Sequence, residues 1–548
     1  MGAYIDVTTF GDLLTRAASQ WPAADAIVFP DTRHSFASLE AAAIRSARSL
    51  IGLGVGKGDH VGILMPNCMD FVEVMFGASM LGAWVVPVNA RFKGRELAYV
   101  AENADLKVLV TSDIIDQHTD YVAILHECLP GLADARSVTM LDLQGAPMLR
   151  SVVMLGEKSP AGMLDRAGFE ALADRATAAD VERNRERVAV RDVAMMMYTS
   201  GTTAMPKGCP MTHEALVRTA VTAGRTRFEL RREDVMWDPL PLFHMSSILP
   251  MIGCFDAGSA YVTMTHIEPG AAIAQMRDEK ATVCFASFPT VTQALINHPD
   301  WDPVEMSRIR LMNNVAPADA LRAIHAALPT SKHMSAYGCT ECGGVVSFTS
   351  PDDPDEIRAT TCGAPFRGIE IEIRDLETNL PVAGPDLRGE IVVRGFNLFE
   401  GYYKDPEKNR ECIEPSGWFH TGDIGSLDDA GRVSYLGRTK DMLKVGGENV
   451  AAVEIESFLQ THPAVSIAQV VGVPDAKYDE VAAAFIECRP GQTVTEAEII
   501  EFCKGSISGF KVPRYVRTVE TWPMSATKIQ KYRLREQLTE ELAQRRPV

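Results

Sequence analysis

The chain is short of basic residues. Its 548 residues include 54 Lys and Arg against 72 Asp and Glu, which gives a formal net charge of −18. So acidic a chain is a poor match for nucleic acid or for an anionic membrane surface. We therefore expect neither of them as a partner.

Long hydrophobic runs are also missing. The longest uncharged stretches, 74–90 and 239–255, both contain proline and polar residues and are shorter than a bilayer-spanning helix requires. No basic segment followed by an apolar run opens the chain, because Asp6 comes early. We expect a cytoplasmic protein with no membrane span.

Two familiar motifs are absent. The eleven cysteines are scattered and odd in number, as in proteins of a reducing compartment. Cys339 and Cys342 form a Cys-x-x-Cys pair without a second pair at zinc-binding spacing, so no zinc site is expected. A Walker A loop needs Gly-Lys-Ser/Thr, whereas here Lys207 precedes Gly208, which disfavours kinase-like and GTPase-like functions.

What the chain does have is a loop rich in hydroxyl groups. Residues 198–208 read Tyr-Thr-Ser-Gly-Thr-Thr-Ala-Met-Pro-Lys-Gly. Backbone N–H groups, hydroxyls and one cation are what a loop needs to wrap a polyphosphate. The apolar segment 193–197 predicts a buried strand before it, and the apolar spacing from Thr212 predicts a helix after it. We therefore expect a phosphate-binding loop between a strand and a helix.

The order of predicted elements indicates an α/β fold of more than one domain. Strand candidates such as 60–65, 84–88 and 282–288 alternate with helix candidates such as 70–81 and those starting at Thr290 and Ala318. From about residue 363 the segments 369–374, 390–393 and 432–436 alternate like antiparallel strands. We predict a large multi-lobed N-terminal domain, 1–439, with mainly parallel sheets and a β-rich lobe. A small α+β domain, 440–548, would follow.

An ordered set of segments then carries a resemblance to a family. Beside 198–208, these are Tyr337-Gly338-Cys339-Thr340-Glu341, Gly417-Trp418-Phe419-His420-Thr421-Gly422-Asp423, Gly437-Arg438-Thr439-Lys440-Asp441, and Lys528 near the end of the chain. In this order they resemble the acyl-adenylate-forming (AMP-binding) superfamily, and within it the acyl-CoA synthetases.

The resemblance implies an ATP-dependent acid–thiol ligase. Such an enzyme activates a carboxylic acid as acyl-AMP, releases pyrophosphate and transfers the acyl group to CoA, with Mg²⁺ as cofactor and ATP and CoA as substrates. The candidate pocket segments are apolar, so the acid is expected to be fatty, alicyclic or aromatic. The resemblance leaves open whether the protein forms a homodimer.

The resemblance also assigns roles to residues. Lys528 would catalyse adenylation, Lys444 would assist thioester formation, and Glu341 would hold Mg²⁺. Lys440 would be the hinge of a mobile C-terminal domain. The residues expected at ATP or AMP are Thr199, Ser200, Gly201, Thr202, Thr203, Lys207, Tyr337, Thr340, Asp423 and Arg438. The acyl pocket would include His244, Ala316 and Gly338, and Gly446 and Gly447 would lie against CoA.

Some positions depart from the family pattern and leave alternatives open. Ala204 and Thr527 stand where glycine is usual, and Asn314 and Val315 replace a Gly-Gly pair. A carrier-protein thiol in place of CoA, a luciferase-like oxidation, and a nucleotide-binding protein without turnover all remain alternatives.

Overall fold

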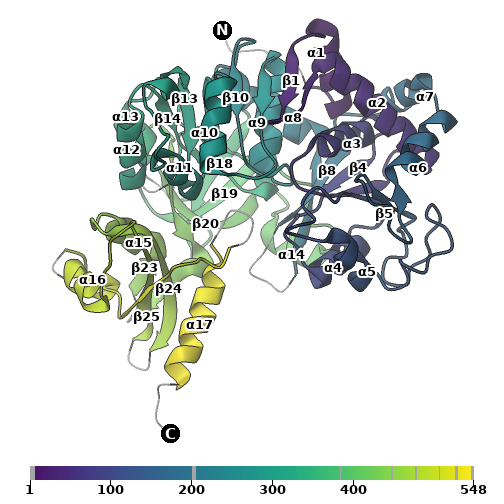
Figure 1. Ribbon diagram of the computed structural model, residues 1–548. Coiled ribbons are helices and arrows are strands. Elements are labelled where there is room, and N and C mark those ends of the chain that lie inside the picture. The colour runs from purple at the N-terminus through teal and green to yellow at the C-terminus, as the bar shows by residue number, and fades with distance from the viewer. Residues whose placement is uncertain are drawn as a thin grey trace.

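The computed structural model describes residues 7–199, 205–316, 318–382, 384–445, 448–475, 478–504, 506–524 and 529–544. Two seven-stranded sheets form the larger part of the fold (Figure 1). The first has the strand order β7-β6-β5-β3-β4-β8-β9, and the second has the order β14-β13-β12-β10-β11-β1-β2. Neighbouring strands are parallel except in the terminal pairs β8–β9 and β1–β2. The α/β prediction is confirmed.

The strands of the first sheet are β3 (His60–Leu64), β4 (Trp84–Pro87), β5 (Leu106–Thr111), β6 (Ser151–Met154), β7 (Leu164–Asp165), β8 (Val193–Thr199) and β9 (Lys207–Thr212). Those of the second are β1 (Asp25–Val28), β2 (Arg33–Ser35), β10 (Val235–Trp237), β11 (Ala260–Val262), β12 (Val283–Ser287), β13 (Leu311–Asn314) and β14 (Lys332–Met334). The helices of this part are α1 (Phe10–Gln20), α2 (Phe36–Gly52), α3 (Met69–Met80), α4 (Gly94–Asn103), α5 (Tyr121–Cys128), α6 (Arg166–Ala171), α7 (Ala178–Arg185), α8 (His213–Thr226), α9 (Met245–Ala257), α10 (Pro269–Asp278), α11 (Pro289–Ile296), α12 (Ala318–Ala327), α13 (Asp355–Thr360) and α14 (Pro406–Cys412).

One hydrophobic cluster joins the two large sheets. It contains buried side chains of β3, β4 and β8 from the first sheet, of β10 and β12 from the second, and of helices α1, α3, α8 and α9. The apolar runs of the parallel strands, such as Val61, Ile63 and Val85, are fully buried, as expected for strands covered on both faces. This shared core holds the carboxyl ends of both sheets in a fixed relation.

Smaller antiparallel sheets follow. The strands β15 (Ala336–Tyr337), β16 (Ser347–Phe348) and β17 (Ala364–Pro365) form one of them. The strands β18 (Ile369–Arg374), β19 (Gly389–Gly395), β20 (Phe419–Leu427) and β21 (Val433–Arg438) form the β-rich lobe expected from the sequence.

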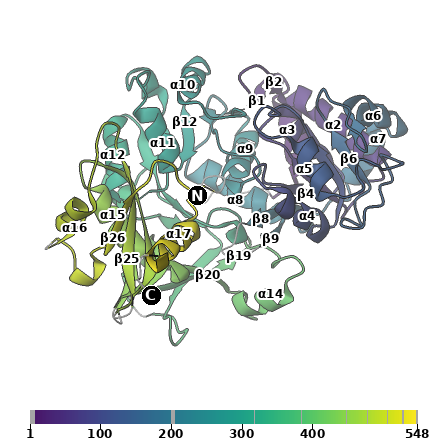
Figure 2. The ribbon, with the colours of Figure 1, turned by 60° about the horizontal axis from the view of Figure 1, so that its bottom comes forward.

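The rest of the chain has its own sheet and cores. Its strands are β22 (Met442–Val445), β23 (Glu448–Ala451), β24 (Val465–Asp475), β25 (Asp479–Cys488) and β26 (Tyr515–Thr518), and its helices are α15 (Ala452–Gln460), α16 (Glu496–Cys503) and α17 (Lys531–Gln544). Figures 1 and 2 show these elements, in yellow-green and yellow, gathered at one side of the molecule. On α15, Glu454 pairs with Arg388 of the β-rich lobe at 2.6 Å and with Lys511 at 2.5 Å. The boundary at Lys440 stays a prediction.

The expected loop between a strand and a helix is wrong in one respect. A strand, β9, antiparallel to β8, lies between the loop and the helix; helix α8 itself begins at His213 with Thr212 as its N-cap, as expected. Pro210 lies within β9, opposite Met196. Proline is tolerated there because β9 is the edge strand of its sheet.

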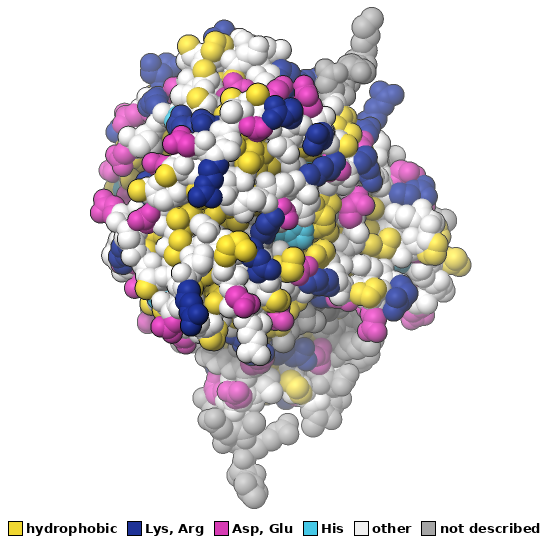
Figure 3. Space-filling view, turned by 90° about the vertical axis from the view of Figure 1, so that its right-hand side faces the viewer, with side chains coloured by type: hydrophobic (Ala, Val, Ile, Leu, Met, Phe, Trp, Pro, Cys, Tyr) yellow, Lys and Arg dark blue, Asp and Glu magenta, His cyan; other side chains and the backbone are white. Residues whose placement is uncertain are grey.

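The surface mixes both charges. On the face that Figure 3 shows, acidic and basic side chains are interspersed with apolar ones. Within the described residues, no helix combines the length and hydropathy that crossing a bilayer demands.

Candidate functional site

A cavity of about 750 Å³ lies at the carboxyl ends of the strands of both large sheets. Segments far apart in sequence line it, from Asn89 to Thr439. Many of the residues expected from the sequence come together here. They are Thr199, Lys207, His244, Tyr337, Gly338, Thr340, Glu341, Asp423 and Arg438.

Other expected residues are not placed there. Ser200, Gly201, Thr202, Thr203, Gly446, Gly447 and Lys528 lie outside the described residues, as do the side chains of Lys440 and Lys444. Among the described residues that line the cavity, Val315 is present and its neighbour Ala316 is not. The roles expected for all of these residues stay predictions.

One end of the cavity is built around Asp423. Asp423 on β20 lies directly opposite Arg438 on β21, and the Arg438 Nε–Asp423 Oδ1 distance is 3.2 Å. The Tyr337 hydroxyl donates to Asp423 Oδ2 at 2.9 Å. Burial disfavours the Arg438 charge, but the Asp423 carboxylate outweighs this and raises the pKa of the guanidinium. A buried carboxylate beside a fixed cation can accept hydrogen bonds from a vicinal diol.

An aromatic face lies beside this carboxylate. The rings of Tyr337 and Tyr435 are stacked with centroids 5.9 Å apart. Burial, and secondly the Asp423 charge, raises the pKa of the Tyr337 phenol, so this hydroxyl stays a donor. Flat rings of this kind suit a purine base.

A second polar group surrounds Glu341. The Tyr402 hydroxyl donates to Glu341 Oε1 at 2.8 Å, and Lys207 Nζ lies 5.0 Å from the centre of the Tyr402 ring. Lys207 is also 3.9 Å from Asp405. Burial, and then the Glu341 charge, raises the pKa of the Tyr402 phenol. The Glu341 carboxylate and the Lys207 ammonium group thus face the same space, next to the end of β8.

Glu341 fits a magnesium ion that shares its ligands with phosphate. Within the described ranges, no three His, Cys, Asp or Glu side chains cluster as a protein-only metal site. Mg²⁺ commonly takes one or two carboxylates and completes its shell with water and phosphate oxygens. Glu341 in a wide cavity, with Thr340 beside it, meets that requirement.

Glycines give the backbone between these groups its shape. A Cβ on Gly338 would lie 2.4 Å from the Gly344 carbonyl oxygen and 2.5 Å from Val345 Cα. Only glycine therefore lets the 337–341 segment pack against the chain at 344–345. This packing carries Thr340 and Glu341 into the cavity.

The other end of the cavity is apolar. It is lined by residues of α9, of the second large sheet, of the segment after α8, and of β16 with the segment that leads into it, namely Leu249, Met236, Phe285, Phe228, Leu230, Val345 and Phe348. His244 lies at the N-cap of α9, with its ring 4.8 Å from Phe243. Gly224 and Gly253 let α8 and α9 approach closely, since a Cβ on Gly224 would be 3.3 Å from Gly253 Cα. Such a chamber suits an uncharged group.

Sequence reasoning missed Tyr402, Lys408 and Thr421, which also line the cavity. The sequence signal near Tyr402 is the glycine before it, in Gly401-Tyr402-Tyr403. Gly401 has a φ of +91°, a conformation that favours glycine. Its contact with Glu341 joins residues 61 positions apart, which no local pattern indicates.

Comparison with known families decides what this arrangement belongs to. The profile of the AMP-binding enzyme family matches residues 14–403, and that of the AMP-binding enzyme C-terminal domain matches residues 454–528. The chain belongs to the AMP-binding enzyme family. The resemblance predicted from the sequence is thereby confirmed.

Relatives of known name lie in the acyl-CoA synthetase branch of the family. A Rhodococcus jostii 3-[(3aS,4S,7aS)-7a-methyl-1,5-dioxo-octahydro-1H-inden-4-yl]propanoyl:CoA ligase is 32% identical, over 97% of this chain and 99% of its own. The rat mitochondrial medium-chain acyl-CoA ligase ACSF2 is 31% identical, over 97% of this chain and 88% of its own. The crystal structure of the anthranilate CoA ligase AuaEII in complex with anthranoyl-AMP aligns with a TM-score of 0.85 at 26% identity, covering 98% of this chain and 99% of that one. The AMP-binding enzyme described here is thus of the acyl-CoA ligase type.

Proposed function

We propose that this AMP-binding enzyme converts an apolar carboxylic acid, ATP and CoA into acyl-CoA, AMP and pyrophosphate. The observation that carries the proposal is one continuous cavity, in which a polar end around Asp423 and Glu341 leads into an apolar chamber around Phe285. A nucleotide and an uncharged acyl group can therefore lie end to end in it.

In the first step the acid carboxylate attacks the α-phosphorus, and the bond from that phosphorus to the pyrophosphate oxygen breaks. Asp423 and Arg438 would hold the ribose, and Tyr337 would lie against adenine. Lys207, Thr199 and the hydroxyls at 200–203 would bind phosphates. The transition state concentrates negative charge, so fixed cations and donors contribute most of the catalysis. Lys528 is proposed as the cation closest to the reacting atoms.

Glu341, with Thr340 beside it, is the residue proposed to hold Mg²⁺, which would neutralise phosphate charge when bound. In the chain itself, Tyr402 donates to Glu341 and fixes one carboxylate oxygen, which leaves the other oxygen for a cation.

In the second step the thiol loses its proton to solvent, its sulfur forms a C–S bond at the acyl carbonyl, and AMP leaves with the electron pair of the broken C–O bond. We propose that the segment after Lys440 turns about this residue between the two steps, which would exchange Lys528 for Lys444 at the site. Gly446 and Gly447 are proposed to let the pantetheine arm approach the backbone. A carrier-protein thiol remains the alternative acceptor.

The apolar end argues for a medium-chain, alicyclic or aromatic acid. The named relatives act on a medium-chain acid, on an alicyclic propanoate and on anthranilate. All eleven cysteines are free, as a reducing compartment requires, and we propose the cytoplasm.

The test is a panel of acids assayed for AMP release with and without CoA, in parallel with acid-dependent ATP–pyrophosphate exchange. We expect pyrophosphate exchange only with apolar acids, whether or not CoA is present. AMP release should rise above background only when CoA is added. Pyrophosphate exchange without any effect of CoA on AMP release would indicate that the acceptor is a carrier-protein thiol. Oxygen uptake or light in the absence of CoA would favour the luciferase-like alternative. No exchange with any acid would favour a nucleotide-binding protein without turnover.

A further inference from the structure

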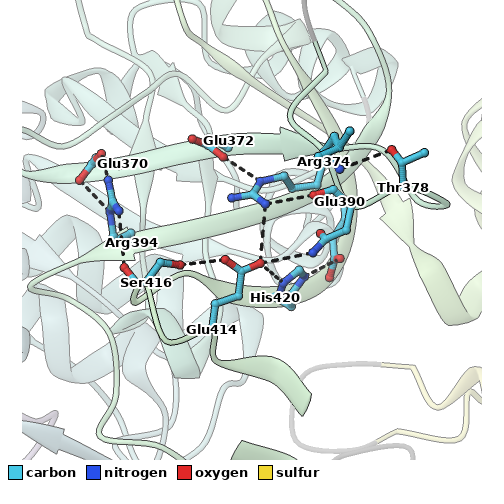
Figure 4. Close-up of polar contacts among 11 residues, drawn as sticks. Glu370, Glu372, Arg374, Thr378, Glu390, Arg394, Glu414, Ser416 and His420 are labelled. Carbon is cyan, nitrogen blue, oxygen red and sulfur yellow. Dashed lines mark hydrogen bonds and ion pairs between the residues drawn. The ribbon is translucent and has the colours of Figure 1, made fainter. Parts of the chain in front are cut away.

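Two carboxylates hold His420, on β20, from opposite sides (Figure 4). Its Nδ1 lies 2.9 Å from Glu390 Oε2, and its Nε2 lies 3.0 Å from Glu414 Oε1. Ionised carboxylates only accept hydrogen bonds, and a neutral imidazole has a single N–H. Both contacts therefore require the doubly protonated, cationic ring.

The second carboxylate oxygen of Glu390 contacts the bulged segment 421–423 of β20, called the turn below, which carries Asp423. Its Oε1 accepts the backbone N–H of Gly422 at 2.9 Å. Gly422 has a φ of +70°, a conformation that needs outside support or glycine. Thr421 fixes the same turn, because its hydroxyl donates to the Ile391 carbonyl at 2.6 Å and accepts the Asp423 N–H at 3.0 Å.

A bulge produces this arrangement. The pairing between β19 and β20 shifts register between Glu390 and Val392, where Val392 pairs with His420 and Glu390 pairs with Ile424. The three β20 residues 421–423 lie opposite Ile391 alone, and such extra residues redirect side chains locally. Here the bulge lets one carboxylate reach both His420 and Gly422.

We infer that Glu390 and His420 are positioning residues for nucleotide binding: the charged ring holds Glu390, and Glu390 holds the turn that presents Asp423 to the ribose. This inference rests on the proposed function, because it assumes a nucleotide in the cavity. Neither side chain is among the described residues that line the cavity.

The charges around the ring decide what deprotonation does. Glu414 also accepts from Ser416 at 2.9 Å and from Asn379 at 3.3 Å, and it lies 3.6 Å from Arg374, which in turn pairs with Glu372. When His420 loses one proton, its ring keeps a single N–H and no positive charge. Glu414 still has the Arg374 cation and the donors of Ser416 and Asn379, whereas Glu390 has the Gly422 N–H and an uncharged ring beside it. Loss of the charge therefore weakens the hold on Glu390 more than the hold on Glu414 and, through Glu390, it affects Gly422.

The direction of the pH dependence follows. Burial lowers the pKa of His420, but the contacts with Glu390 and Glu414 outweigh it and raise that pKa above its ordinary value. AMP affinity should be highest while the ring is charged, and it should fall as pH rises through the pKa of folded His420.

The experiment measures the AMP dissociation constant of the full chain by calorimetry between pH 6 and pH 9. The variants are Glu390→Ala, His420→Arg and His420→Gln. Glu370→Ala is the matched control, because Glu370 pairs with Arg394 on the same sheet and does not contact the turn. Arginine keeps two donors without titrating in this range, so the ratio of wild type to His420→Arg removes the titration of the AMP phosphate.

We expect Glu390→Ala to weaken AMP binding about tenfold at pH 6, the loss typical of one hydrogen bond to a charged group. His420→Gln should weaken AMP binding, and its dissociation constant should show no step with pH. His420→Arg should bind AMP as tightly as wild type does at pH 6, also without a step. Glu370→Ala should match wild type at every pH.

The inference is overturned if Glu390→Ala binds AMP as wild type does, or if His420→Arg keeps the wild-type step. If Glu390→Ala does not fold, the comparison of wild type with His420→Arg still decides. Wild type that binds no AMP and shows no pyrophosphate exchange would instead overturn the proposed function.

Discussion

The hydroxyl of Tyr337 donates a 2.9 Å hydrogen bond to Asp423, a residue 86 positions later in the chain. This contact joins β15 of the three-stranded sheet to β20 of the β-rich lobe. It also fixes one carboxylate oxygen, while Arg438 lies against the other. The polar end of the cavity is thus shaped before any ligand enters.

Replacing Tyr337 with Phe should test this contact. Asp423 would lose a buried donor, so we expect the free energy of unfolding to fall by about 1 kcal/mol and AMP binding to weaken. Urea unfolding and calorimetry would measure both. Tyr532→Phe, at an exposed tyrosine, is the control and should change neither quantity. Unchanged AMP affinity in Tyr337→Phe would mean that Asp423 needs no help from the phenol.

Lys528→Ala should slow acid-dependent pyrophosphate exchange by roughly 10²–10³, as the loss of a charge-stabilising donor does. Transfer from supplied acyl-AMP to CoA should persist. Lys444→Ala should show the reverse selectivity. Equal loss of both half-reactions in either variant would contradict a site that uses two orientations of the C-terminal segment.

Gly338→Ala should damage both stability and activity. The new methyl group would meet the backbone at Gly344 and Val345, which cannot rotate away, and such overpacking typically costs about 1–3 kcal/mol. Thermal unfolding and pyrophosphate exchange would report the two effects. Gly145→Ala, where nothing lies within 4 Å of the new Cβ, should leave both unchanged.

His213 should make the fold sensitive to acid. It is fully buried, and its Nδ1 accepts the Phe10 N–H at 3.2 Å. Burial lowers the pKa of His213 to about 4 from the ordinary 6.5. A lowered histidine pKa means that protons favour the unfolded chain. The free energy of unfolding therefore does not depend on His213 ionisation above pH 6.5. It falls as pH drops from 6.5 toward 4, by about 3 kcal/mol in all.

Urea unfolding of wild type and His213→Asn at pH 7 and pH 4.5 would measure this contribution. Asparagine can accept the same N–H and does not titrate, so its free energy of unfolding should fall less between the two pH values. Buried His333, whose pKa burial also lowers to about 4, is present in both proteins and cancels. Identical pH slopes would assign the acid sensitivity to other groups.

Much of the fold and part of the site could be predicted because their signals are local. The apolar strands around His60 and Val283 and the amphipathic helices between them followed from composition and periodicity. The loop chemistry at 198–208 pointed to phosphate, and the family resemblance assigned Tyr337, Glu341 and Asp423 to a nucleotide site before any contact was known.

What could not be predicted depends on register between distant strands. Pro206 and Pro210 disfavour a strand over 205–212, and strand β9 is possible there because it is an edge strand. The contact of Tyr402 with Glu341 has no local signature. The bridge from His420 through Glu390 to Gly422 follows from one bulge between β19 and β20, and no spacing within either strand indicates that bulge.

Glu454 forms ion pairs with two residues that lie on opposite sides of Lys440 in the sequence: Arg388 of the β-rich lobe and Lys511. If the segment after Lys440 turns as proposed, Lys511 moves together with Glu454, whereas Arg388 does not. The ion pair between Glu454 and Arg388 would then act as a latch that breaks once per turnover. The latch is weak, because the Arg388 side chain is 60% exposed and such pairs contribute little in water. Ionic strength should therefore shift the balance between the two orientations and leave the chemistry within each of them untouched.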